Sequence, residues 1–184
     1  MAKIAVLVTD NFEDAELTSP VKALKDQGHD VTLIETQAGK QITGKHGATA
    51  TIDTTITDVK PEDFDGLLLP GGFSPDELRA DDRFVNFVKA FLLDDKPVFA
   101  ICHGPQFFIQ TGLTKGRTMT AYTTVRPDLY YAGAIVKNEP VVVDHNLVTS
   151  RTPDDLPEFN QAMLAQLKLF KFFHNAFASA EVCV

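Results

Sequence analysis

The feature that most constrains the fold of this chain is a repeated alternation between short apolar runs and stretches with helical spacing. Lys3–Thr9 is apolar and rich in β-forming residues, as expected for a strand buried on both faces. Leu17–Gln27 has apolar residues at helical spacing, Gly28 ends it, and Val31–Glu35 is a second strand-like run. One βαβ unit of this kind implies a parallel sheet with a right-handed crossover.

The same alternation continues to the C-terminal part of the chain. Further strands are expected at Phe64–Leu69 and Pro97–Ile101, and a short one at Thr118–Ala121. Two hairpins are expected, one from Gln41–Thr43 and Ala48–Asp53 and the other from Val141–Asp144 and Leu147–Ser150. Further helices are expected at Arg83–Leu93, from Cys102–Pro105 to Thr111, at Val125–Ala132 and at Leu156–Phe170. The fold class is therefore α/β, a sandwich built on a doubly wound, mostly parallel sheet. The 184 residues fit a single domain over residues 1–170, and residues 171–184 form a tail of unknown role.

Composition and charge disfavour nucleic acids and membranes as partners of this chain. The chain has 17 Lys and Arg against 25 Asp and Glu, a net charge of −8, which disfavours general binding to nucleic acid or to anionic lipid. We see no apolar run near the roughly 20 residues needed to span a bilayer and no signal-peptide cleavage site, so no membrane association is expected. Two cysteines, Cys102 and Cys183, are too few for a disulfide framework, and a cytoplasmic location is expected.

Ligand sites of doubly wound folds gather beyond the carboxyl ends of the parallel strands. Three segments of this chain end predicted strands at that edge, namely Asp10–Asp14, Pro70–Asp76 and Cys102–Pro105. The chemistry is therefore expected in these three segments.

The third of these segments has the steric pattern of a nucleophile elbow, with cysteine in place of serine. Cys102 stands where a strand runs into a predicted helix, and the residues two before and two after it, Ala100 and Gly104, are both small. A helix N-terminus would stabilise a thiolate and lower the pKa of Cys102. The alternative is a buried structural cysteine. His103 could reach the thiol sideways or offer its backbone N–H to an oxyanion, or it could simply cap a helix at the surface.

The other two segments supply weaker candidates. Gly71 and Gly72 permit close approach of the backbone to a ligand, and their N–H groups could face a developing oxyanion. Glu13 could donate from a protonated carboxyl to the thiolate, or it could stabilise the start of a helix, which is the interpretation we prefer for Asp14.

The remaining features of the sequence predict structure and not chemistry. Gly44–Gly47 is interpreted as a hairpin turn and not as a phosphate cradle. No metal-binding motif and no nucleotide-binding glycine motif is present, so neither a metal nor another cofactor is expected. Cys183 is interpreted as exposed and adventitious.

Taken together, these segments resemble the PfpI superfamily, which includes the intracellular cysteine peptidase PfpI, the parkinsonism-associated deglycase and bacterial general stress proteins. The resemblance covers Lys3 to Leu169, and its most specific motif is Ala100-Ile101-Cys102-His103-Gly104-Pro105-Gln106. The supporting motifs are Phe12-Glu13-Asp14-x-Glu16-Leu17, Thr43-Gly44-Lys45-His46-Gly47, Leu69-Pro70-Gly71-Gly72 and Ser150-Arg151-x-Pro153-x-Asp155-Leu156. It implies a flavodoxin-like sheet, similar to that of class I glutamine amidotransferases.

The resemblance also implies a role for individual residues. Cys102 matches the nucleophile, Glu13 the acid that hydrogen-bonds its sulfur, and His103 the adjacent histidine. Gly72 and the backbone of His103 match the oxyanion donors, and Tyr122, with Gly71, matches the substrate pocket. Asp76 matches an acid that reaches the histidine of a neighbouring subunit, although the peptidase PfpI has the longer Glu there. A homodimer or a higher homo-oligomer is implied.

Three functions follow as hypotheses. The first is a cysteine-dependent, stress-protective enzyme that acts on a small reactive carbonyl or on a glycated substrate, as a deglycase or a glyoxalase-like enzyme. The second is an intracellular cysteine peptidase, which we disfavour because no extended peptide groove is evident. The third is a non-enzymatic redox sensor or holdase chaperone, in which Cys102 is oxidised to a sulfenic or sulfinic acid.

Overall fold

The computed structural model describes residues 1–180, with side chains described for residues 1–172. The strands are β1 (Lys3–Leu7), β2 (Asp30–Glu35), β3 (Gln41–Thr43), β4 (Thr49–Thr51), β5 (Thr54–Thr55), β6 (Gly66–Leu69), β7 (Val98–Ile101), β8 (Thr118–Met119), β9 (Ile135–Val136), β10 (Val141–Asp144) and β11 (Leu147–Ser150). The α-helices are α1 (Asp14–Asp26), α2 (Ser74–Leu78), α3 (Asp82–Leu93), α4 (Gln106–Thr111), α5 (Arg126–Tyr131) and α6 (Leu156–Ala180).

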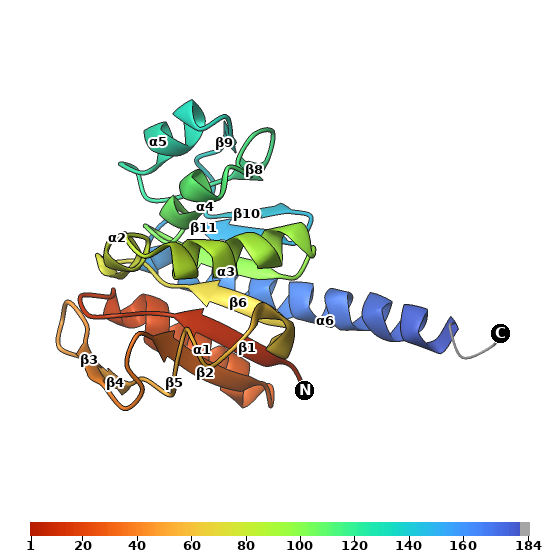
Figure 1. The fold of residues 1–184 in the computed structure, drawn as a ribbon. Helices are drawn as coiled ribbons and strands as arrows, with labels where there is room; N and C mark the ends of the chain where they lie inside the picture. The colour runs from red at the N-terminus through yellow and green to blue at the C-terminus, as the bar shows by residue number, and fades with distance from the viewer. Residues whose placement is uncertain (181–184) are drawn as a thin grey trace.

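The centre of the molecule is a seven-stranded sheet in the order β10-β11-β7-β6-β1-β2-β5 (Figure 1). All neighbouring strands in it are parallel except the edge pair β10 and β11. The predicted α/β class with a mostly parallel sheet is therefore confirmed. The chain adds β2 on one side of β1 and later returns to add β6 on the other side, so the strand order reverses between β1 and β6. A crevice at that switch point is where such folds hold ligands.

Two layers of helices cover the sheet and form separate apolar cores. On one face α1 and α6 pack against Val6 and Phe99, with Leu17, Leu24, Phe159 and Met163 buried. On the other face α2 to α5 contribute a second core. Its largest members are aromatic: Phe64, Phe84, Phe87, Phe91, Phe107 and Phe108. The strands between the two layers are buried on both sides, which is why Lys3–Thr9 and Pro97–Ile101 lack an alternating polar pattern.

The differences from the sequence-based expectations lie mainly at element ends. The first helix begins at Asp14 and not at Leu17, and the short helix α2 was not expected from the sequence. The closing helix continues past Phe170 to Ala180, so the tail set apart from residue 171 begins inside α6. Cys183 lies outside the described residues. Gly44–Gly47 is the turn of a hairpin, β3–β4, that lies off the main sheet, as expected.

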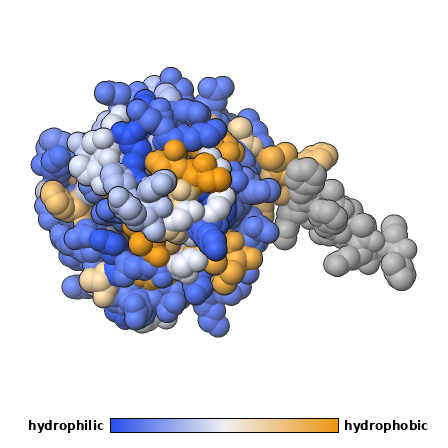
Figure 2. Space-filling view, turned by 90° about the horizontal axis from the view of Figure 1, so that it is seen from above, coloured by the Kyte–Doolittle hydropathy of each residue, from blue (hydrophilic) through white to orange (hydrophobic). Residues whose placement is uncertain are grey.

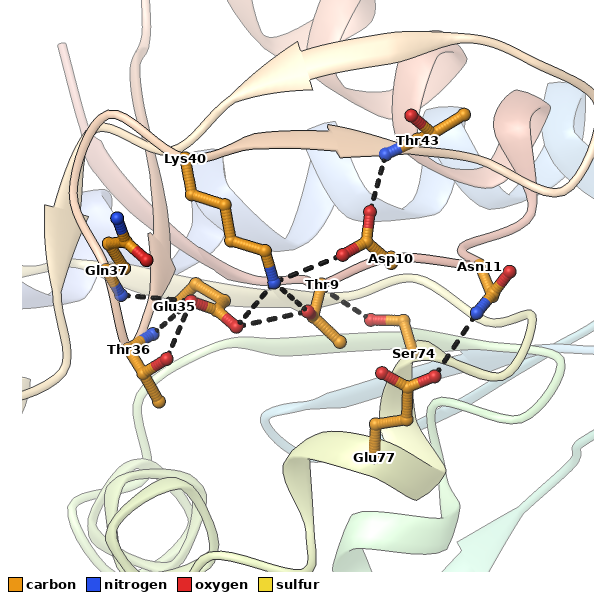
Figure 3. A network of polar contacts seen from close by, with 10 residues as sticks. All are labelled: Thr9, Asp10, Asn11, Glu35, Thr36, Gln37, Lys40, Thr43, Ser74 and Glu77. Carbon is orange, nitrogen blue, oxygen red and sulfur yellow. Dashed lines mark hydrogen bonds and ion pairs between the residues drawn. The ribbon is translucent and has the colours of Figure 1, made fainter.

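A cluster of polar groups around the buried carboxylate of Glu35 attaches that hairpin to the ends of β1 and β2 (Figure 3). Lys40, just before β3, places its Nζ 3.1 Å from both Asp10 Oδ2 and Glu35 Oε1, and it donates to Thr9 Oγ1 at 3.3 Å. Glu35 is only 5% exposed, and its other oxygen accepts the backbone N–H groups of Thr36 and Gln37. The cluster thus neutralises a buried carboxylate and fixes the base of the hairpin.

The face of the molecule on the side of α5 is polar over most of its area (Figure 2). Figure 2, which looks down on the molecule from the side of α5, shows apolar side chains only in small groups on a hydrophilic face. Among the described residues, no helix combines the length and the apolar character required to cross a bilayer.

Replacement of Lys40 by Met is expected to destabilise the fold. It removes the cation that compensates the buried Glu35 carboxylate, and a buried polar group that loses its partner costs about 1–3 kcal/mol. Urea unfolding of Lys40→Met measures this loss. The matched control is Lys22→Met, because Lys22 pairs with Asp26 on the solvent side of α1 with both side chains more than half exposed, and its loss is expected to cost at most about 0.5 kcal/mol. Equal stabilities of the two variants would contradict the buried role of Lys40.

Candidate active site

Cys102 occupies a sharp turn directly after β7. Its φ of +61° lies in the left-handed region that non-glycine residues rarely adopt, and such strain is typical of functional positions. A Cβ on Gly104 would collide with the carbonyl oxygen of Leu69 and lie 3.0 Å from that of Ile101, so only glycine fits there. The steric pattern read as a nucleophile elbow is therefore present, and it presents the thiol above the sheet edge.

Four groups surround the sulfur of Cys102. The carboxyl of Glu16 and the backbone N–H groups of Gly72 and His103 lie close enough to the sulfur to act on its ionisation. The side chain of His103 also reaches it, with Nδ1 at 3.3 Å from Sγ. These groups come from α1, from the loop after β6 and from the elbow itself, so the elements at the switch point converge on one thiol.

The acid next to the sulfur is Glu16 and not Glu13, the residue to which the resemblance assigned this role. Glu16 is completely buried on the inward face of α1, where its Oε2 accepts the N–H of Gly71 at 3.0 Å. Its Oε1 has no nitrogen or oxygen partner among the described residues. Glu13 precedes the helix as its N-cap, and its carboxylate turns to the hairpin, 3.2 Å from His46 Nε2 and 3.8 Å from Lys45 Nζ. The difference arises because Glu13 has an extended backbone before the helix, whereas Glu16 lies within its first turn.

Burial controls the ionisation of the two groups in contact. It raises the pKa of Glu16 from an ordinary 4.5 to about 8, so this carboxyl is mostly protonated at neutral pH. The pKa of the Cys102 thiol is also raised, by burial first and by the charge of an ionised Glu16 second, while the N–H groups of Gly72 and His103 act in the opposite direction. The expected lowering of the thiol pKa is therefore wrong for the resting protein. The helix meant to lower it begins only at Gln106, after a turn, and has six residues.

His103 is held by an aromatic neighbour. Its ring stacks on that of Tyr122, with centroids 5.0 Å apart, and the backbone N–H of Tyr122 donates to the carbonyl of Cys102 at 2.9 Å. Burial, together with the nearby charge of Lys45, lowers the pKa of His103, so the imidazole is neutral at neutral pH and can accept a proton. Tyr122 thus lies in the pocket, where the sequence placed it.

The two glycines after β6 are required by close contacts. Gly72 has a φ of +76°, and a Cβ there would lie against the backbone of Asn11–Glu13. A Cβ on Gly71 would collide with the carboxyl of Glu16 and lie 2.7 Å from Cys102 Cβ. Gly72 therefore places its N–H near the sulfur, its role as an oxyanion donor stays a prediction, and Gly71 leaves space for the Glu16 carboxyl beside Cys102.

Asp76 lies on α2, with its side chain 60% exposed and its Oδ1 accepting from Arg79 Nε at 3.1 Å and Nη2 at 2.8 Å. Its negative charge acts on His103 of the same chain and opposes the lowering of the pKa of that ring. The contact of Asp76 with a histidine of a neighbouring subunit stays a prediction.

The thiol opens into a small pocket of about 170 Å³. The residues that shape its chemistry are Glu13, Glu16, Lys45, Gly72, Cys102 and His103, with Tyr122 on its wall. The described residues include no cluster of three or more His, Cys, Asp and Glu that could hold a metal ion. The described side chains of the pocket offer a thiol, an imidazole and a neutral carboxyl in contact, with a Lys–Glu pair beside them.

Comparison with known proteins agrees with this geometry. The pattern of the DJ-1/PfpI family matches residues 2–166, nearly the whole chain. The chain belongs to the DJ-1/PfpI family. The resemblance inferred from the sequence motifs is thereby confirmed.

Individual DJ-1/PfpI proteins are similar over most of the chain. Two relatives from Bacillus subtilis (strain 168) are "Putative cysteine protease YraA", 60% identical over 90% of this chain and 98% of that protein, and "General stress protein 18", 57% identical over the same shares. Among solved structures, a two-domain protein from Anabaena variabilis with DJ-1/ThiJ/PfpI-like and ferritin-like domains matches with a TM-score of 0.89 and 36% identity. That match covers 91% of this chain and 48% of the two-domain protein.

The raised pKa of Glu16 predicts how stability depends on pH. Between pH 4.5 and about 8 the native carboxyl keeps a proton that the unfolded chain releases, so the free energy of unfolding falls as the pH rises through this window. The slope from this one group approaches about 1.4 kcal/mol per pH unit. Glu16→Gln cannot ionise and keeps the same shape, so its stability relative to the native protein is expected to grow from pH 5 to pH 8. Urea unfolding of both proteins across this range measures it, and parallel curves would show that Glu16 is ionised in the fold.

Proposed function

We propose that this DJ-1/PfpI protein uses Cys102 to convert small reactive carbonyl compounds, with 2-oxoaldehydes such as methylglyoxal, or their early adducts on other molecules, as substrates. The observation that carries this proposal is the 170 Å³ pocket with a strained cysteine, two N–H donors and a neutral imidazole on its floor. Pockets for drug-sized ligands usually measure about 300–1,000 Å³, so this one suits a molecule of a few heavy atoms.

The first step is addition of the sulfur to the aldehyde carbon. His103 Nδ1, 3.3 Å from Sγ, accepts the thiol proton while the C–S bond forms and the carbonyl electron pair moves to oxygen. The developing oxyanion lies next to the sulfur and therefore near the N–H groups of Gly72 and His103, and it takes the proton back from the imidazole. The raised thiol pKa fits this order of events, because the proton leaves only when the carbonyl and the imidazole are both in place.

The second stage is an internal redox reaction followed by hydrolysis. His103 moves a proton from the former aldehyde carbon to the neighbouring carbon through an enediol, so the first carbon is oxidised to a thioester and the second reduced to an alcohol. Water then cleaves the C–S bond, which returns the proton to Cys102 and releases a 2-hydroxy acid. One oxoaldehyde and one water give one hydroxy acid, and no external oxidant or reductant is needed.

The neutral Glu16 carboxyl assists the same cycle. Its Oε2 accepts the N–H of Gly71, so its proton is available to the sulfur. A protonated carboxyl stabilises a thiolate by donating to it, whereas an ionised one would repel it. Glu16 therefore acts as a donor to the sulfur when the thiol proton moves to His103.

Peptide hydrolysis is the alternative suggested by the printed name of the relative YraA. The pocket is too small to hold several residues of a peptide on both sides of a scissile bond. We therefore expect no cleavage of casein or of unstructured peptides under conditions in which methylglyoxal is consumed.

The first test replaces the nucleophile. Cys102→Ala is expected to abolish formation of lactate from methylglyoxal while circular dichroism and thermal unfolding show a native fold, because removal of the thiol leaves the elbow backbone in place. Lactate formation is measured directly, since loss of methylglyoxal alone also occurs by reaction with surface lysines. Retention of enzymatic lactate formation in Cys102→Ala would rule out the mechanism. Oxidation of Cys102 by peroxide in a native protein that forms no lactate would favour the redox sensor.

The second test addresses proton transfer. His103→Ala keeps the backbone N–H but loses the imidazole, and loss of a general acid–base group costs about 10²–10⁴-fold in kcat. The matched control is His145→Asn, because His145 is 85% exposed in the turn between β10 and β11 and is expected to leave kcat unchanged. A kcat within twofold of the native value in His103→Ala would assign the proton transfer to another group.

A further inference from the structure

The turn of the β3–β4 hairpin reaches the pocket from outside the main sheet. Lys45 lies in this turn and lines the pocket together with Cys102, although the sequence predicted only a structural role for Gly44–Gly47. The mechanism proposed above uses the floor of the pocket and leaves Lys45 without a role.

The turn is held in place by specific hydrogen bonds. The backbone N–H of Lys45 donates to the carbonyl of Phe12 at 2.8 Å. Asp14, the first residue of α1, accepts the N–H of His46 at 3.2 Å and of Ala48 at 2.9 Å through its carboxylate. A Cβ on Gly44 would collide with that carboxylate, so glycine is required for this close approach. The backbone of Lys45 is thereby fixed against the loop that precedes α1.

The base of the hairpin is fixed as well. Lys40 binds Asp10 and Glu35 at the ends of β1 and β2 (Figure 3), and Asp10 Oδ1 accepts the N–H of Thr43 at 2.8 Å. The hairpin is thus anchored at both ends, and the position of the Lys45 side chain does not depend on a mobile loop.

Lys45 supplies the positive charge among the described residues that line the pocket. Among the described residues that line the pocket, Lys45 is the one lysine or arginine. Glu16 is protonated and His103 is neutral at neutral pH, so neither contributes a net charge there. The ionised groups are Lys45 and Glu13, which face each other at the pocket mouth.

The ion pair between these two groups is loose. Lys45 Nζ is 3.8 Å from Glu13 Oε2, beyond hydrogen-bond distance, and within the described part of the chain its ammonium makes no hydrogen bond. The other oxygen of Glu13 is closer to its partner, at 3.2 Å from His46 Nε2. The side chain of Lys45 is 53% exposed, so its three N–H donors remain available to a ligand.

We infer that Lys45 is a specificity residue that binds an anionic group, a carboxylate, on the substrate while the carbonyl of that substrate lies at Cys102. This inference rests on the proposed function and narrows its substrate class to oxoaldehydes that carry a carboxylate a few bonds from the reactive carbonyl. A neutral oxoaldehyde such as methylglyoxal reacts at the same floor without this contact.

The first experiment reads out the charge preference at Cys102 without requiring turnover. Iodoacetate and iodoacetamide both alkylate a thiolate with loss of iodide and have nearly the same size, but only iodoacetate carries a carboxylate. Mass spectrometry of the Cys102 peptide gives the rate constant for iodoacetate divided by that for iodoacetamide. This ratio is expected to fall about three- to fivefold in Lys45→Met, which corresponds to the loss of one partly exposed ion pair. Lys45→Arg is expected to keep the ratio.

Two further variants test whether the change in the alkylation ratio is specific to Lys45. Lys22→Met removes the same unit of charge from the exposed side of α1 and is expected to leave the ratio unchanged, so it controls for the net charge of the protein. Glu13→Gln removes the carboxylate that competes for Lys45 and is expected to raise the ratio. A ratio that Lys45→Met leaves unchanged, or lowers no more than Lys22→Met does, would overturn the inference.

The second experiment uses substrates. The native protein is given methylglyoxal and 4,5-dioxovalerate, an oxoaldehyde with a carboxylate at its other end, which with one water gives 2-hydroxyglutarate. Lys45→Met is expected to lower the ratio of kcat/KM for 4,5-dioxovalerate to kcat/KM for methylglyoxal at least threefold, because an effect of the lost charge on His103 acts on both substrates. Equal effects on both substrates would overturn the inference. Absence of enzymatic turnover of either compound would instead refute the proposed function, and the alkylation ratio separates the two failures.

Discussion

The contact between Glu16 and Cys102 is the interaction on which the rest of the site depends. Both side chains are buried at the end of the sheet, and burial raises the pKa of each. Two negative charges in that space would repel strongly, so the pair is stable only while at least one of them keeps its proton. This requirement explains why Gly71 has no side chain to separate them and why N–H groups of Gly72 and His103 are directed at the sulfur.

The fold could be predicted from the sequence because strands buried on both faces are encoded by continuous apolar runs. Lys3–Thr9 and Pro97–Ile101 are continuous apolar runs, since helices cover both faces of their strands. The elbow could also be predicted, because Gly104 can have no side chain where it meets the carbonyl of Leu69. The ends of helices were harder to predict. Helix α1 begins at Asp14, where no apolar residue marks the start, because the free backbone N–H groups of a first turn need only an acidic side chain or water as partner.

The sequence was a poorer guide to which acid meets the thiol and to its ionisation. Glu13 and Glu16 are close in the motif, but Glu13 is the extended N-cap that precedes α1, whereas Glu16 lies within the first turn on its buried face. A signal was present: Glu16 lies four residues before Pro20 and eight before Leu24, on the buried stripe of α1. The thiol pKa could not be inferred, because desolvation depends on every element that packs around Cys102 and has no local sequence pattern.

The site is therefore assembled from two parts with different origins and different constraints. Its floor comes from the ends of β1, β6 and β7 and from α1, where close backbone contacts at Gly71, Gly72 and Gly104 leave little room for change. Its charged mouth comes from the β3–β4 turn and Glu13, which are held to the floor by backbone hydrogen bonds and by the carboxylate of Asp14. Charges at the mouth are more exposed, so interactions with them are weaker and more easily screened than interactions at the floor. Under the proposed function, such a division would allow changes in a single hairpin to alter which carbonyl compound reacts at Cys102.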